Sequence, residues 1–471
     1  MLKKKFSILA LILSLSYAVN SQVLYENLYQ DNGAYAGYDI KPTSDNGYII
    51  TGFCNPTGTF FGQDVLIIKI DSLGDVVWAS NFGDASSDDG KSIIETADGG
   101  FVAIGTLNSF ATSSDDIYLI KVDAFGDFVW EKTWGDSLGD HGYDIVEIPS
   151  DSGFAIAANY FAKPYLIRTD KYGDTLWTKS YADSANIYSI THTLDDGFLL
   201  VGMGYGSMGT RGFAKKVDAT GNELWVTYFI GGGGERLYDC MELPNGNFAL
   251  VGESLEDSPP PKADAILRVL DNSGNSLWYE TYGGAQSDHI ENFCLSSDGG
   301  FVMTGKTHFT SGSNIDDQMY VVKADETGAL GWEVNFGDDF PGSEGGFGIC
   351  TAADGGYVIC GQKTSGGEAY LYIIKLNENG STVSINELPT FKPFEVYPNP
   401  ISDYATITFG EQIAENSVLT LYSISGEIVF TQEINSGISQ FNLYRGDWIS
   451  GTYIITVKNS TTQFSKKVIY L

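Results

Sequence analysis

The alternation of apolar and polar positions predicts a chain built from short β-strands. In one stretch, runs rich in Val, Ile, Tyr and Phe occupy residues 143–148, 154–158, 165–169 and 175–180, and turn residues separate them. Apolar residues at helical spacing are absent. Four strands therefore fit a unit of roughly 50 residues.

Two turn signatures repeat along the chain at this interval. In the first, a tight turn precedes an aromatic residue, and its opening residues are Asp45, Asp98, Asp151, Asp195, Asn245, Asp298 and Asp354. The second reads Asp-x-x-Gly-x-x-x-Trp and ends at Trp78, Trp130, Trp177, Trp225, Trp278 and Trp332. Glycine tolerates the positive φ of tight hairpins, so both signatures suit strand connections. Seven four-stranded repeats predict an all-β fold, a seven-bladed β-propeller over residues 23–384 whose closure protects the sheet edges.

The incomplete seventh copy predicts how the ring closes. Ser384 stands where the seventh Trp would be, whereas residues 23–29 match a Trp-bearing strand with Tyr25 in the Trp place. We therefore expect the N-terminal strand to complete the last blade. The six Trp residues and Tyr25 are expected to pack between neighbouring blades and not to hold a cofactor. The Lys or Arg two residues before most second signatures is expected to make a blade-to-blade or turn contact.

The first 22 residues have the layout of a secretory signal peptide. Lys3, Lys4 and Lys5 precede an apolar run over residues 6–15, and small residues follow. The apolar run is shorter than a membrane-spanning helix requires. We expect residues 1–22 to be removed and the mature chain to carry no transmembrane span.

A different domain follows the repeats. Residues 385–393 are expected to form a linker, and the alternating pattern of residues 394–471 predicts a small β-sandwich. Its motifs resemble the type A C-terminal sorting domain of the Bacteroidetes type IX secretion system. The residues that carry this resemblance are Tyr397, Pro398, Asn399, Pro400, Gly426, Gly451, Tyr453 and Lys467.

The resemblance implies an export route. It implies that the secretion machinery recognises this domain, that a sortase-like peptidase removes it, and that the protein is secreted or held at the outer-membrane cell surface. The alternative is an adhesive β-domain that is retained. The repeats are also similar to a widespread family of the same bacteria that has no agreed biochemical activity.

Charge excludes some partners and suggests one metal. The chain carries 60 acidic and 27 basic residues, a net charge of −33 that repels nucleic acid and anionic membranes. Acidic residues recur on the longer connections, opposite the tight turns, where calcium would need six to eight oxygen ligands. The calcium candidates are Asp88, Asp89, Asp115, Asp116, Asp140, Asp316 and Asp317. A solvated acidic rim is the alternative, and no other cofactor is expected.

The motifs of common catalytic sites are missing from the sequence. The four His form no zinc-binding pair, and neither a nucleophile elbow nor a phosphate-binding loop occurs. The Asp and Glu residues could supply a glycosidase pair, but sequence spacing does not show two carboxylates facing one pocket. Of the five Cys, Cys350 and Cys360 flank the Asp354 turn symmetrically, so we expect them to face each other across the hairpin. They predict either a cross-strand disulfide or two buried thiols.

The sequence therefore predicts an exported, non-enzymatic binding or adhesion module. Its ligand would be an extracellular glycan or protein on the face of the longer loops, because binding residues concentrate on loops. The alternative is a secreted carbohydrate-active hydrolase on the same scaffold.

Overall fold

The structure, a computed structural model, divides the chain into two compact units, Met1–Val383 and Ser384–Leu471. In the first unit it describes residues 25–29, 33–55, 62–83, 87–109, 114–136, 138–160, 163–182, 185–206, 209–229, 234–255, 262–311, 314–337 and 342–381. In the second it describes residues 395–397, 401, 404–409, 413, 416–423, 428–446, 448, 451–458 and 463–470. The predicted signal peptide and linker lie outside these residues.

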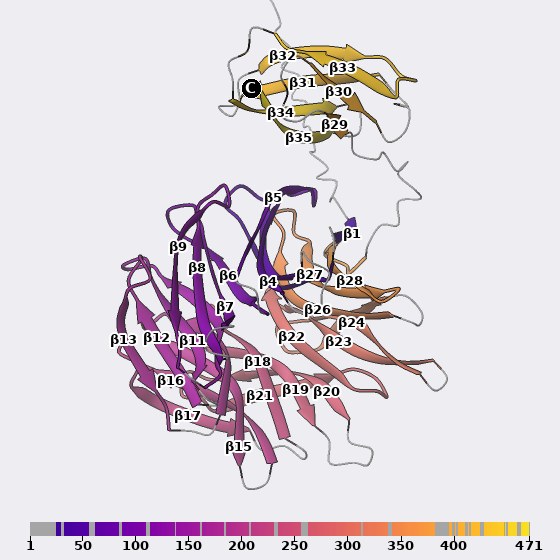
Figure 1. Cartoon of the computed structure of the whole chain (residues 1–471). Coiled ribbons are helices and arrows are strands. Elements are labelled where there is room, and N and C mark those ends of the chain that lie inside the picture. Colours follow the sequence, from indigo (N-terminus) through magenta and orange to yellow (C-terminus); the bar gives the residue numbers. More distant parts are fainter. Residues whose placement is uncertain are drawn as a thin grey trace, which may run out of the picture. The chain divides into compact units, whose positions relative to one another are not determined.

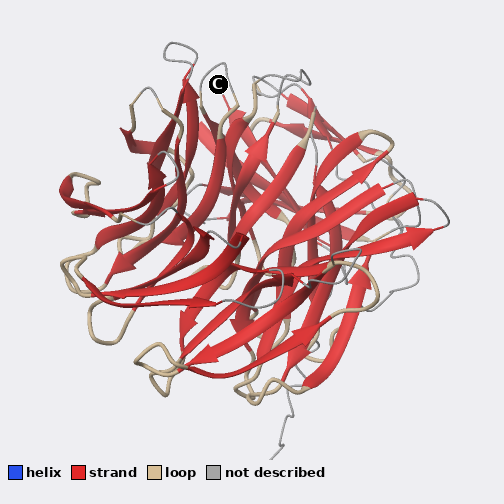
Figure 2. Cartoon of the chain, turned by 90° about the horizontal axis from the view of Figure 1, so that it is seen from below, coloured by secondary structure: helices blue, strands red, loops and turns tan. Residues whose placement is uncertain are grey.

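The first unit contains seven four-stranded antiparallel sheets. Six of them follow the chain order: β2–β5, β6–β9, β10–β13, β14–β17, β18–β21 and β22–β25. The first three comprise β2 (Tyr35–Pro42), β3 (Tyr48–Cys54), β4 (Asp64–Ile70), β5 (Val76–Phe82), β6 (Asp89–Glu95), β7 (Phe101–Ser109), β8 (Ser114–Val122), β9 (Phe128–Trp134), β10 (Asp140–Ile148), β11 (Gly153–Tyr160), β12 (Lys163–Thr169) and β13 (Thr175–Ser180). The next three comprise β14 (Ala185–His192), β15 (Phe198–Gly206), β16 (Gly209–Val217), β17 (Glu223–Phe229), β18 (Gly234–Glu242), β19 (Phe248–Leu255), β20 (Ala263–Leu270), β21 (Ser276–Tyr282), β22 (Asp288–Leu295), β23 (Phe301–Ser311), β24 (Asn314–Ala324) and β25 (Leu330–Phe336). Strands and loops account for all the described residues, with no helix among them (Figure 2).

The seventh sheet joins the two ends of the repeat array. Strands β26 (Gly342–Thr351), β27 (Tyr357–Ser365) and β28 (Glu368–Leu376) are followed in space by β1 (Tyr25–Tyr29). Strand β1 pairs antiparallel with β28, from Tyr25 opposite Lys375 to Tyr29 opposite Leu371. This confirms that the N-terminal strand completes the last sheet.

The seven sheets pack side by side in a closed cycle. The first strands of successive sheets contact one another, and β2 contacts β26, β27 and β28 to join the first sheet to the last. The sequence colours accordingly run once around this unit (Figure 1). Because β2, β6, β10, β14, β18, β22 and β26 touch their neighbours, they are the innermost strands.

Burial within each sheet follows from this packing. All residues of β3 are buried, since neighbouring sheets cover both faces of the middle strands. The fourth strands, such as β5, alternate between exposed and half-buried positions. The antiparallel order also places both signature turns at one end of every sheet and the longer connections at the other.

The basic residue before the second signature makes a turn contact within its own sheet. The Nζ of Lys69, whose side chain is 5% exposed, lies 2.9 Å from Asp45 Oδ1 in the β2–β3 turn. The equivalent pairs are Lys121 with Asp98, Arg168 with Asp151, Lys216 with Asp195, Lys323 with Asp298 and Lys375 with Asp354. The Asp that opens each of these hairpins is thus held by the third strand.

Each signature Trp packs against the second-signature Gly of the next sheet. Gly173 has φ of +77°, and a Cβ atom placed there would lie 2.9 Å from the Trp130 ring. The same contact joins Trp78 to Gly126, Trp177 to Gly221, Trp225 to Gly274, Trp278 to Gly328 and Trp332 to Gly380. At the closure, Tyr25 lies over Gly74 in the same way. The prediction that Tyr25 takes the Trp place is confirmed.

The expected symmetry of Cys350 and Cys360 about their hairpin is wrong. The turn runs from Ala352 to Gly356 and centres on Asp354, so Cys350 lies opposite Val358 and Cys360 lies opposite Gly348. Both are buried free thiols, as are Cys54, Cys240 and Cys294. Of the two predicted states, the structure has the buried thiols.

The second unit has two sheets. Strands β29 (Glu395–Tyr397), β30 (Tyr404–Thr408) and β33 (Gln440–Tyr444) form one, in the order β29–β30–β33. The other has the order β32–β31–β34–β35, with β31 (Ser417–Ser423), β32 (Ile428–Ile434), β34 (Gly451–Lys458) and β35 (Gln463–Tyr470). Residues from both sheets, such as Ile407 and Ile455, share one apolar core.

Candidate functional site

One residue of every innermost strand stands outside the hydrogen-bond ladder. The register breaks between Gly37 and Asp39 in β2, and the other six innermost strands break at the equivalent place. A bulge of this kind inserts one unpaired residue and re-aims its side chain. The seven bulge residues are Tyr38, Lys91, Tyr143, Tyr188, Tyr238, Glu291 and Phe347.

The bulge residues line a central cavity of about 550 Å³. All seven sheets contribute to its wall, and Lys41, Lys306 and Gln362 add to it beside the bulge residues and those that follow them. All seven bulge residues are half-buried, which fits side chains that reach the cavity. The bulge residues lie near the middle of the innermost strands, from the third of seven residues in β6 to the sixth of ten in β26, so this wall lies about midway along the innermost strands.

The aromatic bulge residues form two groups. The ring centroids of Tyr143 and Tyr188 are 5.5 Å apart, and those of Tyr188 and Tyr238 are 5.6 Å apart. We call these three residues the tyrosine arc. Tyr38 and Phe347 form the second group, with centroids 5.5 Å apart.

Lysines cover the second aromatic group. Lys91 Nζ lies 4.3 Å from the Tyr38 ring centroid, and Lys306 Nζ lies 5.1 Å from that of Phe347. Such contacts are favourable because a cation is attracted to the ring face. All lysines of the cavity come from the first, second and sixth sheets, whereas the tyrosine arc comes from the third to the fifth.

The residues after the bulges form a polar belt that ties the sheets together. Its members are Asp39, Ser92, Asp144, Ser189, Asp239 and Asn292. Asp39 Oδ2 accepts hydrogen bonds from Ser92 Oγ at 3.1 Å and from the Ile93 N–H at 3.0 Å, both in the next sheet. Asp144 likewise accepts from the Ile190 N–H at 2.8 Å.

The belt continues to the seventh sheet. Asn292 Nδ2 donates to Asp239 Oδ2 at 3.0 Å, and the Ile349 N–H donates to Asn292 Oδ1 at 3.1 Å. The seventh sheet has Gly348 at the belt position, where a Cβ atom would lie 2.9 Å from the Asp39 Cα. The last sheet therefore meets the first by direct backbone contact.

A shared hydroxyl indicates where the belt holds a proton. Ser189 Oγ lies 2.9 Å from Asp144 Oδ2 and also 2.9 Å from Asp239 Oδ1. A hydroxyl has one proton to donate, so one of the two carboxyl groups must donate in return. Burial, with the nearby charge of Asp144, raises the pKa of Asp239 to about 7, which assigns the proton to Asp239.

Lys41 lies at the level of the polar belt and supplies a positive charge there. Its Nζ lies 2.9 Å from Asp39 Oδ1. Burial lowers the pKa of Lys41, but the charges of Asp39 and Asp144 outweigh burial and raise that pKa above its usual value. The belt carboxylates are thus bound to neighbouring groups, while the bulge residues above them present their side chains to the cavity.

The structure does not gather the calcium candidates into one site. The Asn108 N–H donates to buried Asp88 at 2.7 Å, and the Asp136 N–H donates to buried Asp140 at 3.0 Å, so these carboxylates hold loop backbone. In the described part of the chain, no three His, Cys, Asp or Glu side chains are placed to hold a metal ion.

The other calcium candidates have separate partners. Asp89 pairs with Lys91, Asp115 accepts from the Asn108 amide, and Asp317 contacts His308. Asp116 is adjacent to Asp115, and burial raises its pKa. The side chain of Asp316 lies outside the described residues. Calcium binding stays a prediction.

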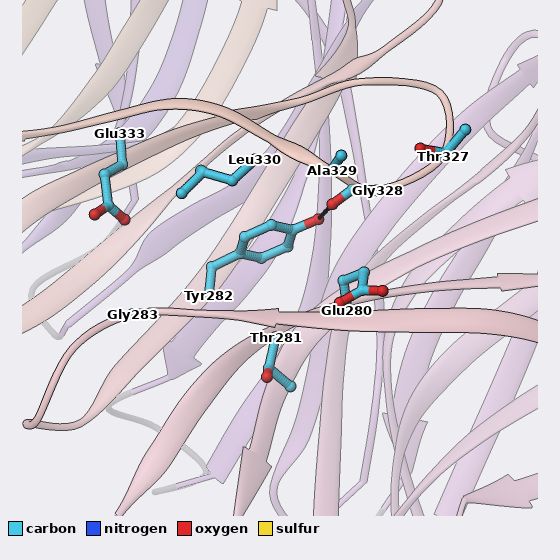
Figure 3. Close-up of a pocket in the computed structure, with 9 residues that line it drawn as sticks. All are labelled: Glu280, Thr281, Tyr282, Gly283, Thr327, Gly328, Ala329, Leu330 and Glu333. Atoms are coloured by element: carbon cyan, nitrogen blue, oxygen red, sulfur yellow. Dashed lines mark hydrogen bonds between the residues drawn. The ribbon is translucent and has the colours of Figure 1, made fainter.

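A second cavity, of about 450 Å³, lies between the fifth and sixth sheets (Figure 3). The Tyr282 hydroxyl crosses it and donates to the Gly328 carbonyl at 2.7 Å (Figure 3). The same junction recurs elsewhere, where the Tyr181 hydroxyl donates to the Gly221 carbonyl at 3.0 Å and Thr227 donates to that of Gly274 at 2.9 Å. This cavity therefore belongs to a packing contact between neighbouring sheets that recurs along the repeats.

The sorting motif is described only in part. Tyr397 ends β29 and is 79% exposed, whereas Tyr453 is 4% exposed and packs in the core of the second unit. Gly451 begins β34 and Lys467 lies in β35. Pro398, Asn399, Pro400 and Gly426 lie outside the described residues.

One comparison with known proteins identifies the C-terminal part of the chain. Residues 395–470 match the family model described as the secretion system C-terminal sorting domain, which indicates export by the type IX secretion system. Among curated proteins, none matches the chain. Within the described residues, no helix is long and apolar enough to cross a membrane.

Solved structures of low sequence identity are similar to this chain in fold. The chain is similar to the Neurospora crassa Pan2 WD40 domain, with 9% identity, 72% of this chain and 89% of that chain covered, and a TM-score of 0.47. It is also similar to virginiamycin B lyase from Staphylococcus aureus, with 11% identity, 74% and 99% covered, and a TM-score of 0.46. A protein of unknown function from Bacteroides caccae has 12% identity, 61% and 93% covered, and a TM-score of 0.40. The closed cycle of four-stranded sheets defines the first unit as a β-propeller, and residues 395–470 match the sorting domain.

Sequence reasoning missed the bulge residues. The signal that could have found them is a third repeated pattern, an aromatic or charged residue seven or eight residues before the opening residue of each first signature. Asp, Ser or Asn follows it in six of the seven copies, and Gly348 follows it in the last. Tyr38-Asp39, Tyr143-Asp144 and Tyr238-Asp239 are its clearest copies. A bulge disrupts the two-residue period by one position, so the pattern does not stand out as a strand.

Proposed function

We propose that the chain is an exported, non-enzymatic binding module, a seven-bladed β-propeller closed by its N-terminal strand and followed by a sorting β-sandwich. The closed cycle of seven sheets and the shared core of the two C-terminal sheets support this architecture. The sorting domain delivers the propeller to the cell surface or the medium. There the propeller binds an extracellular glycan or protein as an adhesion module.

The ring of bulge residues around the central cavity carries this proposal. The polar belt already ties neighbouring sheets, so the scaffold does not need seven further side chains aimed at the cavity. Aromatic side chains together with polar groups in a concave wall are typical of a ligand-binding site, and this wall has five aromatic residues beside eleven polar or charged ones. The cavity of about 550 Å³ is large enough for a small molecule or for the end of a larger one.

Binding to an immobilised glycan panel and to extracellular proteins tests the proposal. We expect the purified protein to bind at least one of these ligands and the Tyr238→Ala variant to lose that binding. Tyr172→Ala is the matched control, because Tyr172 is 58% exposed on a signature turn and lies away from the cavity. If Tyr238→Ala binds as well as the wild type, the central cavity is not the binding site.

The alternative is a carbohydrate-active hydrolase, which one observation favours. Asp144 and Asp239 face one hydroxyl, and the raised pKa of Asp239, about 7, is that of a general acid. Against this, backbone and belt groups already occupy their oxygens: Cys240 N–H and Asn292 donate to Asp239, and Ile145 N–H donates to Asp144. Release of reducing sugar from a bound glycan, abolished in Asp239→Asn, would favour the hydrolase.

A further inference from the structure

The shape of the central cavity limits how a ligand can enter. Its wall contains residues from all seven sheets, so the cavity is enclosed on every side around the ring. A ligand reaches it only along the ring axis. A polymer therefore enters by one of its ends or by a short side branch, and an internal segment does not lie across the wall.

The tyrosine arc provides the surface on which a ring would stack. Its three aromatic side chains are contiguous, and no lysine or arginine lines the cavity from the sheets that carry them. One face of Tyr38 and one face of Phe347 are already covered by Lys91 and Lys306. The arc is thus the open aromatic wall of the cavity.

The lysines of the cavity are already paired with carboxylates. Lys91 Nζ lies 2.8 Å from Asp89, and Lys306 Nζ lies 3.7 Å from Asp317. At the belt level Lys41 is paired with Asp39, as described above.

The acidic bulge residue is paired as well. Glu291 lies 3.2 Å from His289, and although burial opposes it, the hydrogen bond and charge of Glu291 raise the pKa of His289. Paired charges attract a further ion weakly. They keep spare hydrogen-bonding capacity, since an ammonium has three donors and a carboxylate about four acceptor sites.

We infer that the central cavity takes the terminal sugar residue of a glycan, an uncharged polyhydroxylated ring. Its C–H face stacks on the tyrosine arc, and its hydroxyls bond with Glu291, Gln362 and the lysines opposite. This inference rests on the proposed binding function. It adds that recognition is end-on and that one residue of the glycan supplies most of the contacts.

The experiment counts chain ends. A glycan that the purified protein binds is partially hydrolysed, so that the same mass carries about ten times as many ends, and each preparation competes with the immobilised polymer. We expect about ten times less mass to be needed for half-inhibition after hydrolysis. The neutral monosaccharides of that glycan are expected to compete, whereas glucuronic acid and glucosamine compete at least tenfold less well.

Variants of Tyr188 test whether the tyrosine arc makes the contacts with the glycan. Tyr188→Ala removes its middle ring and is expected to weaken competition by about tenfold, while Tyr188→Phe keeps the ring and most of the binding. Tyr172→Ala should bind as the wild type. Matching melting temperatures of the variants would show that the fold is kept.

Two negative outcomes differ in meaning. If the polymer binds in a Tyr188-dependent way but hydrolysis weakens competition and monosaccharides do not compete, end-on recognition is wrong and the binding site stands. If Tyr188→Ala binds the polymer as the wild type does, both the inference and the proposed site are wrong.

Discussion

The strongest test of the architecture is a single substitution at the ring closure, Tyr25→Ala. Tyr25 is the first residue of β1, packs over Gly74, and joins the apolar cluster between the first and last sheets. Truncating a packed aromatic side chain costs about 3–5 kcal/mol in a protein core. Because Tyr25 is only half-buried, we expect the lower end of that range, about 3 kcal/mol.

The expected change in melting temperature follows from the size of the unit. Unfolding entropy is about 2.1 cal/mol/K per residue, which gives about 0.7 kcal/mol/K for roughly 350 residues. A loss of about 3 kcal/mol then lowers the melting temperature by about 4 °C. Thermal and urea unfolding, followed by circular dichroism, measure this change.

Two variants of the same strand serve as controls. The Tyr25 hydroxyl is buried without a hydrogen-bond partner among the described residues, so Tyr25→Phe should keep or raise stability, by up to about 1 kcal/mol. Leu28 is 47% exposed on the same strand, so Leu28→Ala should change stability by less than about 0.5 kcal/mol. If Tyr25→Ala and Leu28→Ala have the same melting temperature, the closure does not stabilise the ring and the reasoning fails.

Three further predictions concern pH and export. The folded state holds the Asp239 proton up to about pH 7, whereas the unfolded state releases it near pH 4, so this group lowers stability as pH rises between those values. Asp239→Asn should flatten the melting temperature over that range, and an unchanged slope would contradict the assignment. Hydrogen bonds from Lys216 and Thr193 overcome burial and lower the pKa of Asp195 to about 2, so its contribution is present above about pH 4 and lost as pH falls towards 2. Asp195→Asn should weaken that loss in acid unfolding curves, relative to the wild type. Deleting residues 394–471 should keep the propeller inside the cell envelope, as fractionation and immunoblotting would show, and a truncated chain found outside would refute the sorting role.

The scaffold could be predicted because its determinants are local. Gly173 and Trp177 belong to one signature of eight residues, and the copies at fixed intervals make the strand number and the closing role of Tyr25 readable. Two features explain the repeat: the signature Gly has a positive φ, and the Trp of each signature packs on the signature Gly of the next sheet.

The candidate site could not be predicted, because it depends on register and on distant parts of the chain. Asp144, Ser189 and Asp239 are about 50 residues apart in sequence and meet only when the third, fourth and fifth sheets pack side by side. The same difficulty produced the error at Cys350 and Cys360, where moving the centre of a turn by one residue changes every opposing pair.

The bulges separate specificity from stability in this molecule. A residue outside the hydrogen-bond ladder, half-buried beside a cavity, can be exchanged without breaking a strand pair or a core contact. Seven such places face one cavity, and Tyr occupies four of them and Lys, Glu and Phe the other three. New ligand preferences can therefore be selected by randomising these seven positions together, while the Trp and Gly signatures that hold the ring stay constant.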